Sequence, residues 1–220
     1  MPHAGLFNAS FCKAPGLLEG SEIATDRLKA PDENATGRPT VQDLRAFSLP
    51  QEFRGRSGLY VLAWWLVRDT VFLCSPQPLY GFRRWLLRLF GAQIGANVLI
   101  RPTVRVTYPW KLRIDDEAWI GDFVELYTLG EIHIGAHAVV SQNSYICTGS
   151  HDFRKVGFDI YAKPIVIEPQ AWVAADVFVG PGVTVGYGAV IGARSTLMKD
   201  APPLKILAGN PATVVGDRVV

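Results

Sequence analysis

Histidine is scarce in this chain, which narrows the choice of residues for acid–base chemistry. The four histidines are His3, His133, His137 and His151, and His151 closes the run NSYICTGSH just before a long irregular stretch. An imidazole titrates near neutral pH and can accept a proton from a hydroxyl. His151 is therefore the leading candidate for a general base, although a single histidine on a turn is more often an ordinary surface residue.

Two charged residues are expected to line up with His151. The chain carries a six-residue repeat, and counting back one coil of it, with its two inserted residues, leads to Glu131, and one coil earlier to Lys111. Adjacent strands lie about 4.8 Å apart, so the three side chains should form an outward ladder. Glu131 would then fix the imidazole tautomer, and Asp152 competes for that role. An ordinary cross-strand charge ladder is the alternative.

Two rival chemistries use the same few residues. His133, His137 and His151 are three ligands of the kind that bind zinc, but His133 lies in an insertion and His137 at a different point of its repeat. Cys147 is a candidate nucleophile for a ping-pong enzyme, but a cysteine inside a repeat usually packs. We therefore expect neither a metal site nor an acyl-cysteine.

Composition excludes some classes of protein. The 220 residues include 22 basic and 20 acidic ones, so no bulk charge favours a nucleic-acid partner. The three cysteines, Cys12, Cys74 and Cys147, are widely spaced and predict no disulfide framework, which fits a reducing cytoplasm. The N-terminus lacks a basic region followed by an apolar core, so no signal peptide is expected.

The six-residue period is the strongest pattern in the sequence. Neither a helix, with period 3.6, nor an ordinary strand, with period 2, repeats at six, and such a repeat is typical of short parallel strands wound into a β-helix. Three hexads make one coil, which gives about five coils. The repeating aliphatic positions are Ile94, Ile100, Val106, Ile114, Ile120, Leu126, Ile134, Val140, Ile146, Ile167, Val173, Val179, Val185, Ile191 and Leu197.

The repeat divides the chain into four parts. Residues 1–40 read as a flexible tail, 41–93 as an irregular segment with a helical cap, 94–202 as the β-helix with an extruded loop over 152–166, and 203–220 as a C-terminal extension. In the second part, Phe47 and Leu49 are candidate anchors.

The two expected helices have two interpretations. The first, Leu59 to Cys74, is apolar nearly all round but too short to span a membrane, and the second runs from Leu79 to Phe90. They are either a cap on the open end of the β-helix or a pair that also lies on a membrane surface. In the second case the tryptophans would sit among headgroups and the arginines on lipid phosphates. These residues are Trp64, Trp65, Trp85, Arg83, Arg84 and Arg88.

Several segments resemble a known family. The runs NSYICTGSHD and ILAGNPATVV are similar to the maltose/galactoside O-acetyltransferase superfamily. The runs VQDLRAFSLPQEFRG, LLRLFGAQIG, IRPTVRVTYPWKL, LYTLGEIHIGAH and CTGSHDF more closely resemble the colanic acid biosynthesis acetyltransferases, over about Val41 to Val215. The resemblance implies a left-handed parallel β-helix, a homotrimer with sites between subunits, acetyl-CoA as donor and His151 as general base.

The resemblance also implies binding residues. Trp172, Ala175, Ala193 and Lys199 align with coils that contact coenzyme A, and Arg218 is a substitute for basic residues missing near the end. The superfamily's active-site asparagine has no counterpart, so Glu125, Tyr127 and Asn143 are the candidates for contacting the acceptor.

The function implied is O-acetylation of a sugar hydroxyl in an exopolysaccharide or its lipid-linked precursor, in the cytoplasm or at the inner face of its membrane. Acyl transfer to an amine and a non-catalytic scaffold are the alternatives. A trimer is further favoured by Trp110, Trp119 and Trp172, because exposed aromatic residues usually mark interfaces.

Overall fold

The computed structural model describes residues 37, 39–50 and 53–219, and the chain divides into two units, Met1–Pro39 and Thr40–Val220. The predicted flexible tail over residues 1–40 therefore lies almost entirely outside the described residues. The second unit contains the predicted cap, β-helix and C-terminal extension.

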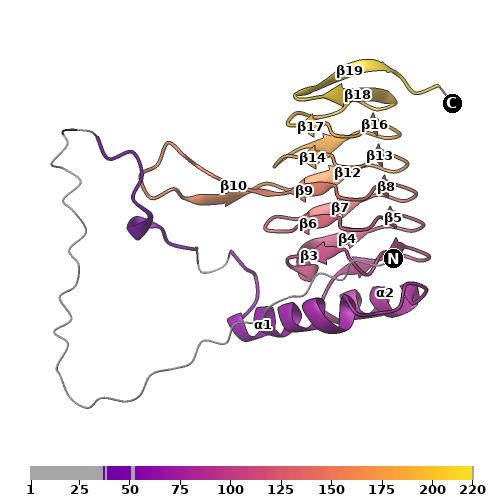
Figure 1. Cartoon of the computed structure of the whole chain (residues 1–220), viewed down its shortest axis with the longest axis horizontal. Helices are drawn as coiled ribbons and strands as arrows, with labels where there is room; N and C mark the ends of the chain where they lie inside the picture. Colours follow the sequence, from indigo (N-terminus) through magenta and orange to yellow (C-terminus); the bar gives the residue numbers. More distant parts are fainter. Residues whose placement is uncertain (1–36, 38, 51–52, 220) are drawn as a thin grey trace, which may run out of the picture. The chain divides into compact units, whose positions relative to one another are not determined.

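The second unit is a left-handed parallel β-helix with three sheets, and Figure 1 shows its coils stacked along one axis. Sheet A contains β1 (Gln93–Ile94), β4 (Leu112–Ile114), β7 (Ile132–Ile134), β12 (Ile165–Ile167) and β15 (Thr184–Val185). Sheet B contains β2 (Leu99–Ile100), β5 (Trp119–Ile120), β8 (Val139–Val140), β13 (Trp172–Val173), β16 (Val190–Ile191), β18 (Lys205–Gly209) and β19 (Ala212–Asp217). Sheet C contains β3 (Arg105–Val106), β6 (Glu125–Tyr127), β9 (Tyr145–Cys147), β14 (Phe178–Val179) and β17 (Thr196–Leu197).

The predicted repeat is confirmed position by position. All fifteen aliphatic residues are buried, and equivalent residues pair between coils, as Ile114 does with Ile94 and with Ile134. Identical inward positions stack directly, so each coil covers the apolar side chains of the one before it. Five complete coils are present, as expected.

The C-terminal extension continues the β-helix instead of leaving it. Ala201 pairs with Val185 of β15, and β18 pairs in parallel with β16, which begins a sixth turn. Strand β19 then returns antiparallel along β18. The hairpin of β18 and β19 thereby extends sheet B beyond the fifth coil.

Two corners of the coils use residues with positive φ. Short polar residues such as Asn tolerate this left-handed conformation better than most. One corner has Asn97, Glu117, His137 and Gln170, and another has Phe123, Asn143, Asp176 and Arg194. The positions of His137 and Asn143 thus have a sufficient backbone explanation.

Two helices close the first coil, as the cap interpretation predicts. They are α1 (Gly58–Val67), which continues into a π-helical turn η3 (Arg68–Phe72), and α2 (Tyr80–Leu89). Their buried residues Trp64, Phe72 and Leu87 join the same apolar core as the coils. Helix α2 ends at Leu89 and is followed by Gly91, where φ is +91°, and the Ala92 N–H donates to the Leu87 carbonyl. This is the Schellman geometry that glycine favours.

The first coil has no coil before it, so its backbone groups on the cap side have no strand to pair with. The N–H of Leu99 donates to Ala118, one coil on, and that of Trp119 donates to Ala138. The equivalent carbonyls of the first coil face the cap, where buried acceptors need donors.

Side chains of the cap donate hydrogen bonds to these carbonyls. Arg88 donates to the Ile94 carbonyl at 2.8 Å and Arg84 to Val98 at 3.0 Å. Arg83 donates to Ile100 at 2.6 Å, and the indole of Trp64 donates to Val106 at 2.9 Å. The cap is therefore fastened by hydrogen bonds in all three sheets as well as by apolar packing.

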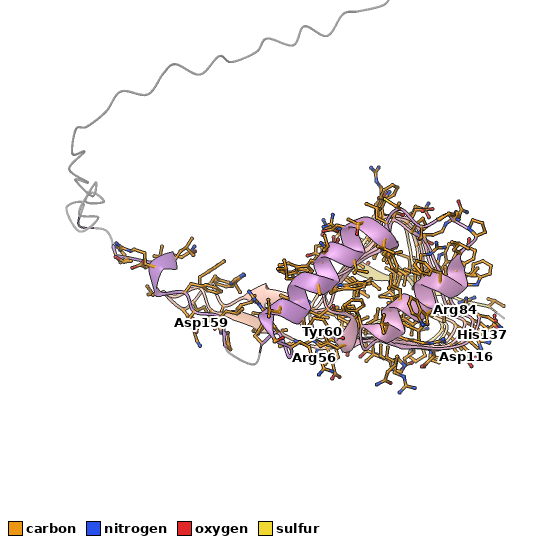
Figure 2. The ribbon with its side chains drawn as sticks, turned by 90° about the horizontal axis from the view of Figure 1, so that it is seen from below. Arg56, Tyr60, Arg84, Asp116, His137 and Asp159 are labelled. Atoms are coloured by element: carbon orange, nitrogen blue, oxygen red, sulfur yellow. The ribbon has the colours of Figure 1, made fainter. Side chains whose placement is uncertain are left out.

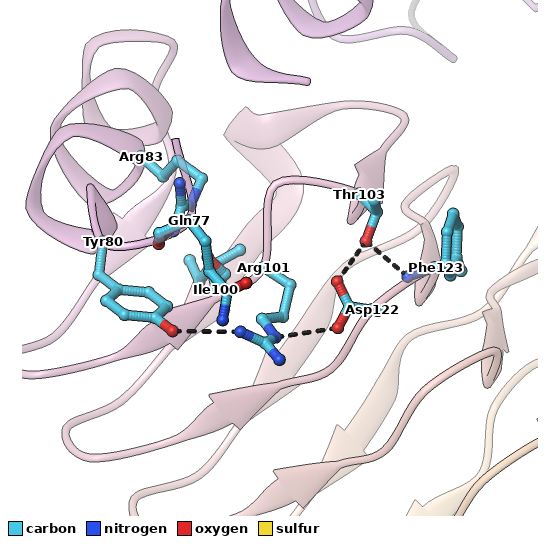
Figure 3. A network of polar contacts seen from close by, with 8 residues as sticks. All are labelled: Gln77, Tyr80, Arg83, Ile100, Arg101, Thr103, Asp122 and Phe123. Atoms are coloured by element: carbon cyan, nitrogen blue, oxygen red, sulfur yellow. Dashed lines mark hydrogen bonds and ion pairs between the residues drawn. The ribbon is translucent and has the colours of Figure 1, made fainter. Parts of the chain in front are cut away.

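Arg83 is the centre of this attachment. Its guanidinium is fully buried and also donates to Ser75 Oγ and to the carbonyls of Pro76 and Gln77. Burial lowers its pKa, because the charged form loses water. Figure 3 shows a second link beside it, in which Arg101 bonds both Tyr80 of α2 and Asp122 of the next coil.

These contacts correct the expected roles of several cap residues. Trp64 and Arg83 are fully buried and Trp65 is half-buried, so they are not available to lipid headgroups in this conformation. Trp110 is also not an open interface residue, because its indole donates to the Arg54 carbonyl and its ring stacks on Tyr108. In the part of the chain that the structure describes, no helix is long and apolar enough to cross a bilayer.

The extruded segment is a β-hairpin, and its boundaries differ from the expected loop over 152–166. Strand β10 (Gly149–His151) pairs antiparallel with β11 (Ile160–Ala162), and the β-helix resumes at Ile165. The hairpin leaves at Gly149, where an added Cβ would lie 2.6 Å from Leu129 Cδ1. A larger residue at this exit would therefore have to displace the Leu129 side chain.

Replacing Arg83 by Met should strongly destabilise the fold. Several buried acceptors would lose their donor, at about 1–3 kcal/mol each, so we expect the free energy of unfolding to fall by about 3 kcal/mol or more. Arg84→Met, which removes a hydrogen bond to Val98, is the matched control and should cost about 1 kcal/mol. Urea denaturation measures both, and equal small losses would contradict the account.

Candidate active site

His151 lies at the end of β10 and faces a hollow along the hairpin. A cavity of 660 Å³ is lined by one side of the hairpin and by two residues of the N-terminal segment, by which we mean residues 39–50. Its walls are Ser48, Pro50, His151, Asp152, Phe153, Arg154, Lys155, Asp159, Ile160, Tyr161, Ala162 and Lys163. Charges of both signs lie beside the imidazole, which suits a ligand rich in hydroxyl groups.

The imidazole is held by Phe158, which lies across the hairpin. His151 Nδ1 is 2.7 Å from the Phe158 carbonyl oxygen, and the two rings stack at 4.2 Å with an interplanar angle of 7°. A carbonyl can only accept, so Nδ1 carries the proton of the neutral ring. The lone pair is then on Nε2, the nitrogen that can take a proton.

Phe158 itself has a constrained backbone. Its φ is +52°, in the left-handed region that a bulky residue seldom adopts. The conformation turns its carbonyl and its ring toward the same imidazole. Strain of this kind is typical of sites where geometry matters for function.

The N-terminal segment completes the surroundings of His151. The Asp43 N–H donates to the Val156 carbonyl at 2.8 Å, and the Phe47 ring lies 6.0 Å from the His151 ring. Between them is a short 3₁₀ turn, η2 (Leu44–Ala46). Phe47 therefore lies beside the site, although Phe47 and Leu49, the two expected anchors, are equally exposed at 37%.

The predicted ladder of Lys111, Glu131 and His151 is wrong at its last member. Ile132 pairs with Leu112 on one side and with Ile165 on the other, so Pro164 takes the place next to Glu131. The hairpin carries His151 out of the coil. Glu131 instead lines a second hollow together with Lys111, and burial lowers the pKa of Lys111 while Glu131 opposes that change.

Asp152 is close to the imidazole in sequence but is engaged elsewhere. Its carboxylate accepts from Arg154 at 2.8 Å, and this bond lowers its pKa. Its backbone N–H donates to the Asp159 carbonyl. The orienting partner of His151 in this structure is the Phe158 carbonyl, where a carboxylate was expected.

The three expected acceptor-binding residues occupy different places. Tyr127 is near the hairpin exit, with Cε1 3.3 Å from a Cβ built on Gly149. Glu125 is half-buried on sheet C opposite Arg105, and burial raises its pKa. Asn143 is an exposed corner residue. Of the three, Tyr127 is thus adjacent to the base of the hairpin.

The expected coenzyme A residues are spread around the β-helix. Trp172 is exposed on sheet B, and Ala175 and Ala193 follow the paired strands β13 and β16 into the corner between sheets B and C. Lys199 is exposed after β17. Arg218 donates to the Gln170 and Gly188 carbonyls, at the corner between sheets A and B.

The three histidines named for the zinc alternative are not gathered. His133 Nε2 is 2.7 Å from Asp115 Oδ2, and His137 is at a coil corner. Within residues 37, 39–50 and 53–219, no three His, Cys, Asp or Glu side chains form a group that could hold a metal ion.

Comparison with known proteins gives a consistent set of relatives. No family model matches the chain. Over 179 residues it is 58% identical to an Escherichia coli K12 protein named as a colanic acid biosynthesis acetyltransferase, WcaF, across 81% of this chain and 98% of that protein. Over 137 residues it is 31% identical to the galactoside O-acetyltransferase of the same strain, across 60% and 67% of the two chains.

A solved structure shares the architecture. The hexapeptide-repeat acetyltransferase of Vibrio cholerae, complexed with acetyl coenzyme A, matches with a TM-score of 0.64 and 25% identity, across 77% of this chain and 89% of that one.

The contact with Phe158 predicts one tautomer of His151. In nitrogen NMR spectra of histidine-labelled protein at a pH where the ring is neutral, we expect Nδ1 to be protonated and Nε2 bare. Phe158→Ala should loosen the ring and mix the tautomers. Phe123→Ala is the matched control, because Phe123 has a similar φ of +58° but lies at a coil corner. Finding Nε2 protonated in the unaltered chain would refute the assignment.

Proposed function

The chain belongs to the family of colanic acid biosynthesis acetyltransferases, and from this we propose that it transfers an acetyl group from acetyl-CoA to a sugar hydroxyl of an exopolysaccharide or its lipid-linked precursor. The observation that carries the proposal is His151, whose Nδ1 is fixed by the Phe158 carbonyl while the ring lines the hairpin cavity.

His151 acts as the general base of a direct transfer. Nε2 takes the proton of the acceptor hydroxyl as its oxygen attacks the thioester carbonyl. The carbon–sulfur bond breaks, and the thiolate of coenzyme A takes that proton from the imidazolium. The Phe158 carbonyl stabilises the imidazolium by accepting from Nδ1 throughout.

The walls of the cavity can hold the acceptor. Asp152 and Asp159 accept hydrogen bonds and Arg154 and Lys155 donate them, and all four line the hollow. Tyr161, which is partly exposed there, offers an apolar ring face of the kind on which a sugar packs. Asp152 thereby serves as an acceptor-binding residue rather than as the partner of His151.

The active site is completed by a second copy of the chain. On one chain, His151 leaves between sheets C and A, whereas Ala175 and Ala193 lie at the corner between sheets B and C. A neighbour packed along the prism brings the hairpin of one copy toward the coenzyme A residues of the next. Trp119 and Trp172 are exposed on sheet B and supply aromatic area for this contact. We infer a homotrimer.

His151→Ala should lose about 10²–10⁴-fold in kcat, the usual contribution of a general base. Binding of coenzyme A should persist, because the residues expected to contact it are on the coils. His133→Ala is the control and should keep its activity, since His133 pairs with Asp115 outside the cavity.

Two results would contradict this assignment. One is near-normal turnover by His151→Ala. The other is an acetyl group trapped on Cys147 and detected by mass spectrometry, which would indicate a ping-pong route.

The assembly is tested separately. Light scattering should give three times the 24.2 kDa mass of the chain. A stable monomer that is fully active would show that one chain supplies the whole site.

A further inference from the structure

The outer face of the helical cap is strongly apolar. Figure 2 views the molecule from the side on which α1 and α2 lie. We call "cap face" the exposed apolar side chains of these helices and their connection, which are Leu59, Leu62, Leu66, Val71, Leu73, Leu79, Trp85 and Leu89. A patch of this kind on a monomer marks a docking surface.

Helix α1 lacks the polar face that a water-exposed helix needs. Its inner residues Val61 and Trp64 are buried in the core, while Leu59, Leu62 and Leu66 on the other side are 81%, 60% and 66% exposed. Its other exposed residues are Gly58 and Ala63. An exposed helix normally places charged or polar residues there, so the outer side of α1 matches an apolar medium.

Charge is concentrated around the same helices. Residues 53–90 contain six arginines and one aspartate, whereas the rest of the chain has 16 basic and 19 acidic residues. Asp69, the one acidic residue, is paired with Arg68 at 2.7 Å. The cap therefore carries an excess of positive charge on a chain whose remainder is slightly negative.

We propose that the cap face docks on an anionic lipid bilayer, with α1 lying in the interface and its three exposed leucines between the headgroups. Apolar insertion and attraction between basic residues and anionic lipid are the two contributions that hold such helices at a membrane. Arg56 is exposed just before α1 and can approach lipid phosphates.

The charge of the cap favours lipid over a second copy of the chain. Two cap faces brought together would place like charges against each other, which costs energy at an interface. A bilayer rich in phosphatidylglycerol offers both the opposite charge and an apolar interior. The residues of the cap face are separate from the buried Trp64 and Arg83, which hold the cap to the coils.

Docking would fix the distance between the proposed active site and the bilayer surface. The hairpin leaves from the third coil, so His151 stands roughly 20 Å above the bilayer surface, counting the helix layer and two coil spacings. A sugar chain on a lipid carrier reaches that height. This consequence rests on the proposed function, whereas the docking itself does not.

Vesicle flotation tests the proposal without acetyl-CoA or any acceptor. The full chain should float with vesicles of phosphatidylethanolamine and phosphatidylglycerol, bind less to phosphatidylcholine alone, and be released by salt. Leu62→Gln/Leu66→Gln should weaken binding about ten-fold or more, because each substitution removes a large apolar side chain from the interface. The control is Val214→Gln/Val215→Gln, a comparably exposed apolar pair on β19.

Thermal unfolding of both double variants should match that of the unaltered chain, since these side chains are exposed. The proposal is overturned if the full chain stays unbound, or if the leucine variant floats as well as the control. It is also overturned if light scattering shows an association between copies that the leucine substitutions abolish, because a second copy then covers the cap face. An inactive enzyme that still floats would refute the proposed function alone.

Discussion

The open edge of the first coil is the constraint on which the rest of this structure depends. In the second coil the carbonyls of Ala118 and Ile120 accept from the coil before, but the equivalent carbonyls of the first coil face no strand. Three arginines and one tryptophan of the cap supply the missing donors. The cap is for this reason fixed in orientation, and its remaining surface is free to serve another purpose.

The same stacking decides where chemistry can occur. Residues inside the coils are committed to packing, and positive-φ corners are committed to turning the chain. The hairpin leaves the coil at Gly149, so its residues take part neither in the packing of the coils nor in their corners. Its paired strands hold Phe158 against His151, and the short segment through Phe47 lies on the other side of the imidazole. The stacked coils thus carry His151, the proposed base, on a projecting hairpin.

Periodicity made much of the fold predictable, and its limits explain the errors. The six-residue period located all fifteen core positions, and proline and glycine marked the ends of the two helices. The ladder through Glu131 failed because the count treated His151 as the next repeat, whereas Pro164 resumes the register after the hairpin. Phe158 was missed because antiparallel pairing across a hairpin has no six-residue signature. The turn residues of KVGFD, just before the short apolar run IYA, were the available signal.

The central claim is that the base of one subunit serves the coenzyme A residues of its neighbour, and mixed trimers test it most directly. One variant would carry His151→Ala, and the other Ala175→Trp/Ala193→Trp to block the corner between sheets B and C. Each should be nearly inactive alone. Co-expressed, they should recover activity, because some interfaces then pair an intact His151 with an intact corner. Mixed trimers that are no more active than either parent would contradict the account.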